Sequence, residues 1–161
     1  FFSEELQGRY KEHFDIIMSG GFIEHFDDPT DAIQKHVDLI KKNGYFIITV
    51  PNFQGINSVL ARFFNEDIAS THNFSIPNKE GFEAAFPRDG IEKLYCHYFG
   101  TLYFGLYAFN YEKNGRLKYF FYRFLVRFQV VLNVLFSFVL GEKGFETKYT
   151  SPYIIFIGKK L

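Results

Sequence analysis

The chain has 161 residues, 47% of them hydrophobic, and its 18 Lys and Arg balance 18 Asp and Glu. This length and composition support a single domain with a sizeable core, so we expect residues 1–161 to form one domain. The balanced charge argues against a nucleic-acid partner, because neutralising phosphates needs a basic surface. The lone Cys96 excludes an internal disulfide and a cysteine cluster for zinc, which favours a reducing, cytoplasmic setting.

Two buried strands are predicted in the first third of the chain. The run Phe14-Asp15-Ile16-Ile17-Met18, closed by Ser19-Gly20-Gly21, is typical of a buried parallel strand near 14–19. Residues 45–50 form a second apolar run, which ends at Pro51 because proline cannot donate to a strand ladder. With a helix between them, the two strands predict a right-handed parallel β-α-β unit.

The helix between these strands carries its own start and stop signals. Asp28 can cap it, and Pro29 suits the first helical position. Lys41 and Lys42 are expected in its last turn, before a stop at Gly44. Apolar residues recur at helical spacing on its inner face, at Ile33, Val37 and Ile40. His36, on the same helix, is expected at the surface.

The rest of the chain continues the α/β pattern. Helices are predicted around residues 56–63 and 79–86, and strands over 91–99 and 152–159. Between those strands lies an aromatic-rich region, 101–150, which contains a long apolar stretch at 116–140.

Short motifs in the first third of the chain point to a family. They are Phe14-Asp15, Ser19, Glu24-His25, Asp27-Asp28, Lys42-Asn43-Gly44 and Pro51-Asn52. In this order they resemble the second half of a class I S-adenosylmethionine-dependent methyltransferase, with Asn43 where the family commonly has glycine. The resemblance covers most of 10–100 and the last ten residues, and makes 101–150 a helical insertion or a family-specific cap.

The resemblance implies a partial Rossmann-like sheet: later parallel strands plus an antiparallel C-terminal hairpin, near 91–99 and 152–159. The family's Gly-rich cofactor loop and its acidic anchors belong to earlier strands, and no G-x-G occurs in this chain. At roughly 30 residues per β-α-β unit, a missing part would be about 80–100 residues long. We therefore expect a truncated chain that is inactive and binds little or no cofactor alone.

The same resemblance suggests where a cofactor would lie. Ser19, Gly20, Gly21 and Phe22 would line the methionine part of S-adenosylmethionine, with Phe22 as a wall. Glycines at the carboxyl end of a parallel strand let backbone approach a ligand there. The alternative is an ordinary strand-to-helix turn.

Histidines supply the remaining candidates. His25 could orient the cofactor or act as a general base, although local hydrogen bonding by the Glu24-His25 pair is an alternative and methyl transfer can proceed by positioning alone. His72 and Asn73 are substrate-side candidates by resemblance, with an ordinary polar loop as an equal alternative. No metal site is expected, because the other histidines lack ligand spacing; they are His13, His36 and His97.

The stretch 116–140 is predicted to be a helix with polar and apolar sides. Arg116, Arg123 and Arg127 fall on one side, with Gln129, Asn133 and Ser137 in a neighbouring sector. The apolar side is expected at Phe121, Phe124, Leu125, Phe128, Leu132, Leu135 and Val139. This pattern fits a helix lying at a membrane surface better than one crossing it. The alternative is a helix packed onto the sheet or onto a second copy.

These observations lead to one main hypothesis and one rival. The complete protein would transfer a methyl group from S-adenosylmethionine to a small or lipid-like acceptor, in the cytoplasm or at the membrane periphery. The rival is a non-catalytic interaction or membrane-docking module on the same scaffold. An exposed edge of the 14–19 strand also predicts a homo-oligomer.

Overall fold

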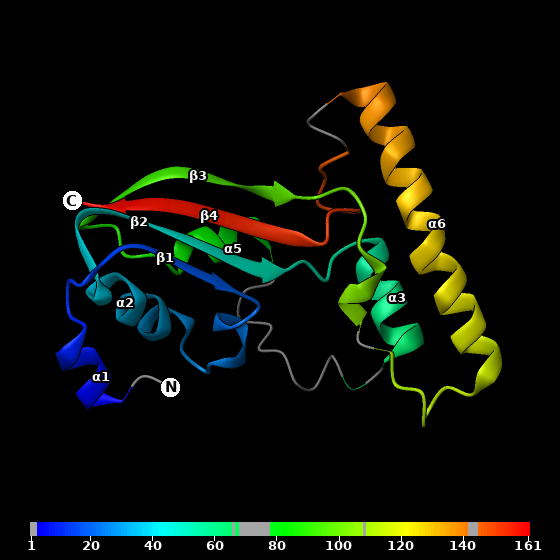
Figure 1. Cartoon of the computed structure of the whole chain (residues 1–161), viewed down its shortest axis with the longest axis horizontal. Helices are drawn as coiled ribbons and strands as arrows, with labels where there is room; N and C mark the ends of the chain where they lie inside the picture. The colour runs from blue at the N-terminus through cyan, green and yellow to red at the C-terminus, as the bar shows by residue number, and fades with distance from the viewer. Residues whose placement is uncertain (1–2, 66, 68–77, 108, 142–144) are drawn as a thin grey trace. The chain divides into compact units, whose positions relative to one another are not determined.

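The computed structural model shown in Figure 1 describes residues 3–65, 67, 78–107, 109–141 and 145–161. The regular elements are α1 (Glu4–Arg9), β1 (Phe14–Gly20), η1 (Ile23–His25), α2 (Pro29–Leu39), β2 (Ile40–Pro51), α3 (Ile56–Phe64), α5 (Lys79–Ala84), β3 (Ile91–Phe99), η2 (Phe104–Tyr107), α6 (Arg116–Leu140) and β4 (Tyr153–Lys160). The chain divides into two compact units, which we treat separately. The first comprises 1–50, 73–97 and 154–161, and the second 51–72 and 98–153.

The strands form a four-stranded sheet in the order β1-β2-β4-β3. β1 and β2 are parallel, with Ile16 opposite Tyr45 and Gly20 opposite Thr49. Figure 1 shows β4 running against the other three strands. The predicted fold class, parallel strands followed by an antiparallel C-terminal pair, is therefore confirmed. β1 lies at one edge of this sheet, and the prediction that it is buried is wrong, because Phe14, Ile16 and Met18 are exposed at that edge.

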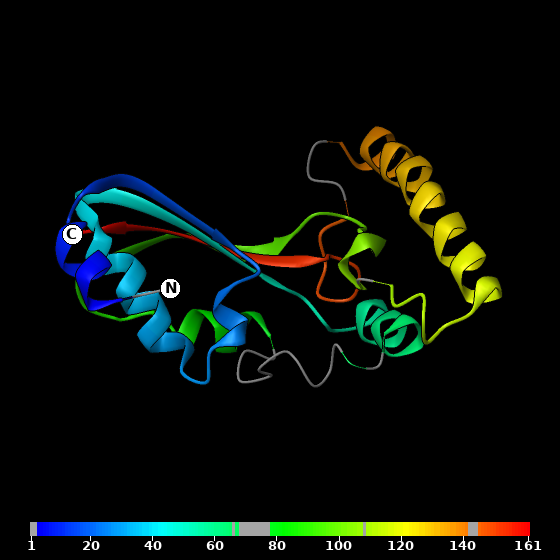
Figure 2. The same cartoon turned by 60° about the horizontal axis from the view of Figure 1, so that its bottom comes forward.

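An apolar layer joins the sheet to the helices of the first unit. Side chains alternate along β2, so that Phe46, Ile48 and Val50 are buried on one face. The ring of Phe156 on β4 stacks on that of Phe86, with centroids 3.5 Å apart. Figure 2 shows α2 and α5 together on one side of the sheet. This layer is the core of the first unit.

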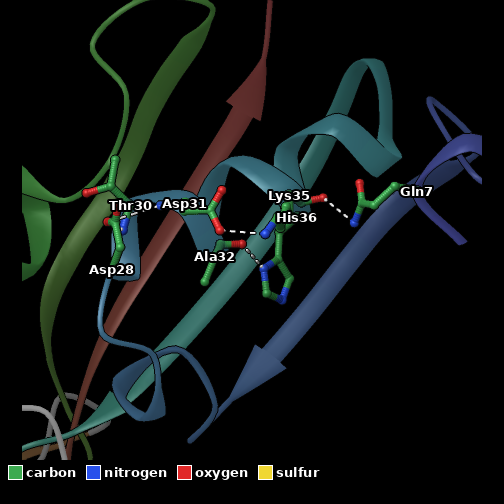
Figure 3. Close-up of polar contacts among 7 residues, drawn as sticks. All are labelled: Gln7, Asp28, Thr30, Asp31, Ala32, Lys35 and His36. Atoms are coloured by element: carbon green, nitrogen blue, oxygen red, sulfur yellow. Dashed lines mark hydrogen bonds and ion pairs between the residues drawn. The ribbon is translucent and has the colours of Figure 1, made fainter. Parts of the chain in front are cut away.

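α2 begins as the sequence predicts but ends earlier. The Asp28 carboxylate accepts hydrogen bonds from the amides of Thr30 (2.9 Å) and Asp31 (3.3 Å), as Figure 3 shows. The prediction that Lys41 and Lys42 occupy the last helical turn is wrong. β2 begins at Ile40, which pairs with Phe14, and Lys41 forms an ion pair with Asp15 of β1 at 2.9 Å. Pairing with the neighbouring strand overrides helical propensity here.

The second unit has a separate aromatic core. Ala61 and Phe64 of α3 pack with Phe104 and Tyr107 of η2. The Asn57 side chain accepts a hydrogen bond from the Tyr107 hydroxyl at 2.7 Å and donates one to the Ser151 carbonyl at 2.8 Å. Asn52 donates to the same carbonyl at 2.7 Å. Buried amides thus tie the segment around Ser151 to the start of α3.

α6 has the predicted bounds, but most of its predicted apolar side is exposed. Gln129 is its single buried residue, whereas Phe121, Phe124 and Phe128 are exposed. Leu125, on the same predicted apolar side, packs against the aromatic core of the second unit, so this side is only partly exposed. Gln129 and Asn133 of the polar sector face the unit, because their side-chain amides bond to the backbone of Phe104 and Leu102. Ser137 of the same sector is exposed. By length and composition alone, α6 could cross a membrane.

Candidate functional site

The turn that follows β1 contains the residues predicted to contact a cofactor. Ser19 and Phe22 are half-buried, while Gly20 and Gly21 are exposed. Gly21 has a φ of +61°, which favours glycine, and its amide donates to the Thr49 carbonyl at 3.0 Å. The turn is thereby fixed to β2 at its carboxyl end, with its backbone accessible from outside.

A groove of about 400 Å³ lies beside β1 and ends at this turn. Its walls include Ser19 and Phe22 at the turn, Ile17 and Met18 on β1, and His36 and Leu39 on α2. Most of this lining is apolar. The groove therefore places two of the predicted cofactor residues, Ser19 and Phe22, in one concave surface of the first unit.

His36 is a member of this groove that sequence reasoning misplaced. The expectation that it lies at the surface is wrong, because it is only 6% exposed. As Figure 3 shows, its Nδ1 donates to the Ala32 carbonyl at 2.7 Å, and its ring lies edge-on to Phe22. Burial lowers the pKa of His36. The helical spacing from Ala32 and Ile33, which are also buried, was the signal for an inward position.

Glu24 is a second buried titratable group next to the turn. It lies in η1 and is 5% exposed. Within the described part of the chain, its Oε2 atom has no hydrogen-bond partner. A Cβ built on Gly21 would lie 3.5 Å from its Oε1, so the carboxyl group lies next to the glycine turn. Burial raises the pKa of Glu24, because the charged form loses its hydration.

The other candidates are arranged less specifically. The His25 side chain is 47% exposed, and its Nε2 lies 4.0 Å from Glu24 Oε1. His72 and Asn73 lie outside the described residues. No group of three potential metal ligands occurs among the residues that the structure describes. Burial raises the pKa of Cys96 to about 11, so that its thiolate is scarce at neutral pH.

The residues at the turn fit one end of S-adenosylmethionine. Gly20 and Gly21 leave backbone groups accessible, Phe22 offers an apolar wall, and the buried Glu24 carboxyl group has an oxygen left to accept a hydrogen bond. A hydrogen-bond acceptor beside an apolar wall suits an amino group next to an apolar chain, as in the methionine moiety. The sequence has no G-x-G turn for the nucleotide end.

Comparisons with known proteins concern the family pattern and the fold. Residues 4–48 match the model of the family described as Methyltransferase domain. No curated protein sequence matches the chain. Among solved structures, an S-adenosylmethionine-dependent methyltransferase from Thermotoga maritima superposes with a TM-score of 0.53 at 14% identity, over 94% of this chain and 58% of that one. An S-adenosylmethionine-dependent methyltransferase from Archaeoglobus fulgidus has a TM-score of 0.46 at 17% identity, over 97% of this chain and 64% of that one.

The chain thus spans about three-fifths of the length of these two solved proteins, 58% and 64%. At such low identity the superposition on the Thermotoga maritima protein establishes the fold, and the family match adds a sequence pattern over residues 4–48. The chain has the fold of the S-adenosylmethionine-dependent methyltransferases, and its N-terminal part carries the sequence pattern of a methyltransferase domain.

Proposed function

We propose that this chain takes part in the transfer of a methyl group from S-adenosylmethionine to a small or lipid-like acceptor. The observation that carries the proposal is the Ser19–Phe22 turn at the carboxyl end of β1. In open α/β sheets, ligands bind at the carboxyl ends of parallel strands. Here that position combines accessible glycine backbone, an apolar groove and a buried carboxyl group.

Each residue of the turn has a role in this proposal. Gly20 and Gly21 allow the methionine part to approach the backbone, and Phe22 excludes water on one side. Glu24 accepts a hydrogen bond from the amino group. The cofactor supplies a methyl group on a sulfonium centre, and the protein holds the acceptor atom in line with it. We assign to His25, exposed beside Glu24, the role of accepting a proton from an acceptor that must lose one.

The first experiment measures binding of S-adenosylhomocysteine by calorimetry to the polypeptide that the intact gene encodes. We expect binding, and we expect Gly21→Val to weaken it at least tenfold, because a side chain at φ +61° distorts the turn. Gly90→Val is the matched control: Gly90 has a φ of +78° but precedes β3, away from the turn. Equal effects of the two substitutions would count against the assigned site.

A second arm uses the 161-residue chain alone, for which we expect little or no binding because it has no G-x-G turn. Micromolar, stoichiometric binding by this chain would contradict that expectation while leaving the methyl-transfer proposal in place. If the gene product also failed to bind, methyl transfer would be abandoned in favour of the non-catalytic module.

Substitutions of His25, His72 and Asn73 test the side of the site that would bind the methyl acceptor. If His25 is the base, His25→Gln should lower kcat and leave cofactor affinity unchanged. His72→Ala and Asn73→Ala should raise KM for the acceptor without changing cofactor binding. A His25 variant with an unaltered kcat would limit this residue to local hydrogen bonding.

A further inference from the structure

One side of α6 is apolar and exposed over its whole length. We call it the outer face of α6. Its apolar members are Leu117, Phe120, Phe121, Phe124, Phe128, Val130, Val131, Val134, Leu135, Phe138 and Val139, all more than 40% exposed. Phe138 is the extreme case and is 89% exposed. Soluble proteins rarely leave a continuous apolar surface of this extent uncovered.

The opposite side of the same helix contacts its own unit through both apolar and polar groups, and Tyr122, Leu125 and Val126 pack against the aromatic core. The Gln129 side chain accepts a hydrogen bond from the amide of Phe104, and Asn133 donates to the Leu102 carbonyl at 2.9 Å. Lys118, near the start of the helix, donates to the Phe63 carbonyl at 3.1 Å. A helix in water normally buries apolar groups and exposes polar ones. α6 packs apolar groups on its inner side but also exposes a second apolar side, the outer face, which suits apolar surroundings.

The charges of α6 show what kind of apolar surroundings fit. Arg116, Arg123 and Arg127 are exposed, and residues 116–140 contain no Asp or Glu. None of the three arginines is in an ion pair with another described residue. The exposed cations can therefore pair with anions of a partner, next to the Phe and Val side chains. An anionic lipid surface offers acidic headgroups and hydrocarbon within one layer.

We propose that the outer face of α6 docks on an anionic lipid bilayer, with the helix lying along the membrane surface. The in-plane orientation follows from the contacts of the helix with its own unit. They run from Lys118 to Asn133, so a helix crossing the bilayer would have to carry the loops at Leu102 and Phe104 into hydrocarbon. An interfacial helix keeps these contacts on the water side.

A second copy of the chain is a poorer occupant of this face. Two outer faces brought together would bury the arginines of both helices without a carboxylate from either α6, since residues 116–140 contain none. Burying unpaired cations is unfavourable. Lipid binding by α6 does not depend on cofactor binding at the Ser19–Phe22 turn.

The test uses the absence of tryptophan from the sequence. Phe138→Trp places one reporter on the outer face, and Tyr149→Trp places one at an exposed aromatic position of the same unit outside α6. Each 161-residue variant is titrated with phosphatidylcholine vesicles containing phosphatidylglycerol, and with pure phosphatidylcholine vesicles. Emission wavelength and iodide quenching are recorded, and light scattering of the lipid-free protein reports its oligomeric state.

With anionic vesicles, we expect a blue shift and protection from iodide for the Phe138→Trp variant and not for the Tyr149→Trp variant. Arg123→Glu and Arg127→Glu should each weaken partitioning at least fivefold, since one basic residue near an anionic surface changes affinity by about that factor, whereas Lys148→Glu, outside α6, should have a smaller effect. No shift in the Phe138→Trp variant with anionic vesicles would overturn the proposal. A shift that instead follows protein concentration without lipid would assign the outer face to a second copy.

Discussion

α2 and α6 differ in which side chains they bury and which they expose. α2 has a side-chain cap at Asp28, an Asp31–Lys35 ion pair on its outside and a buried stripe on its inside. α6 has no side-chain cap, buries the amide of Gln129 and exposes phenylalanines. The difference teaches that α2 buries its apolar stripe, whereas α6 is attached by apolar packing and by the Gln129 hydrogen bond and leaves a second apolar side exposed.

The largest expected effect lies in the buried stripe of α2. Ile33 is fully buried, and Ile33→Ala should lower the free energy of unfolding by about 2–5 kcal/mol through lost burial and a cavity. Val134→Ala, at an exposed position of α6, should change it by no more than about 0.5 kcal/mol in lipid-free buffer. Urea unfolding followed by circular dichroism measures both. Comparable losses would mean that α6 is packed in solution.

The next effect tests the inward polar contact of α6. Gln129→Leu removes the acceptor for the Phe104 amide and leaves this buried donor unpaired, which costs about 1–3 kcal/mol. Ser137→Ala is the control, because the Ser137 hydroxyl is exposed and bonds only to a carbonyl of its own helix. The same urea titration applies. A stabilised Gln129→Leu variant would show that α6 prefers apolar contact on its inner side.

A smaller effect is expected at the start of α2. Asp28→Ala removes the acceptor for the amides of Thr30 and Asp31 and should cost about 1 kcal/mol. Asp28→Asn keeps an oxygen in place and should cost less. The shift in melting temperature separates the two variants. If they melted together, the carboxylate charge rather than the hydrogen bond would be the stabilising element at this end.

Sequence reasoning located most elements of the fold. The apolar runs at 14–19 and 45–50 and the Asp28-Pro29 start are local signals, and the structure has a strand or helix at each. The end of α2 was missed because Ile40 pairs with Phe14, and the inward position of His36 because helical spacing was applied to apolar residues alone.

The candidate site was predicted in part. The glycine turn is a local motif and could be read from the chain, but the burial of Glu24 and His36 depends on the packing of the whole unit, which no local motif reveals. Which side of α6 faces its own unit could not be predicted from the sequence either. It depends on backbone groups at Leu102 and Phe104 that periodicity within the helix does not reveal.

The last prediction concerns acid stability, which should depend on α2 and not on α6, because residues 116–140 contain no histidine or carboxylate. Burial holds the pKa of His36 in the folded chain below its ordinary value of about 6.5. The unfolded chain therefore binds the proton first as pH falls. The stabilising contribution of neutral His36 is complete above about pH 6.5 and is lost as pH falls through the folded pKa.

His36→Gln should flatten this loss of stability between neutral and mildly acidic pH, while His13→Gln, at an exposed histidine, should leave it unchanged. Both are measured in a Glu24→Gln background, by urea unfolding at a series of pH values. The background is needed because Glu24 acts in the opposite sense: its raised folded pKa makes its contribution complete below about pH 4.5 and lost as pH rises through that pKa. An acid-sensitive His36→Gln variant would place the proton uptake elsewhere in the chain and remove α2 as its source.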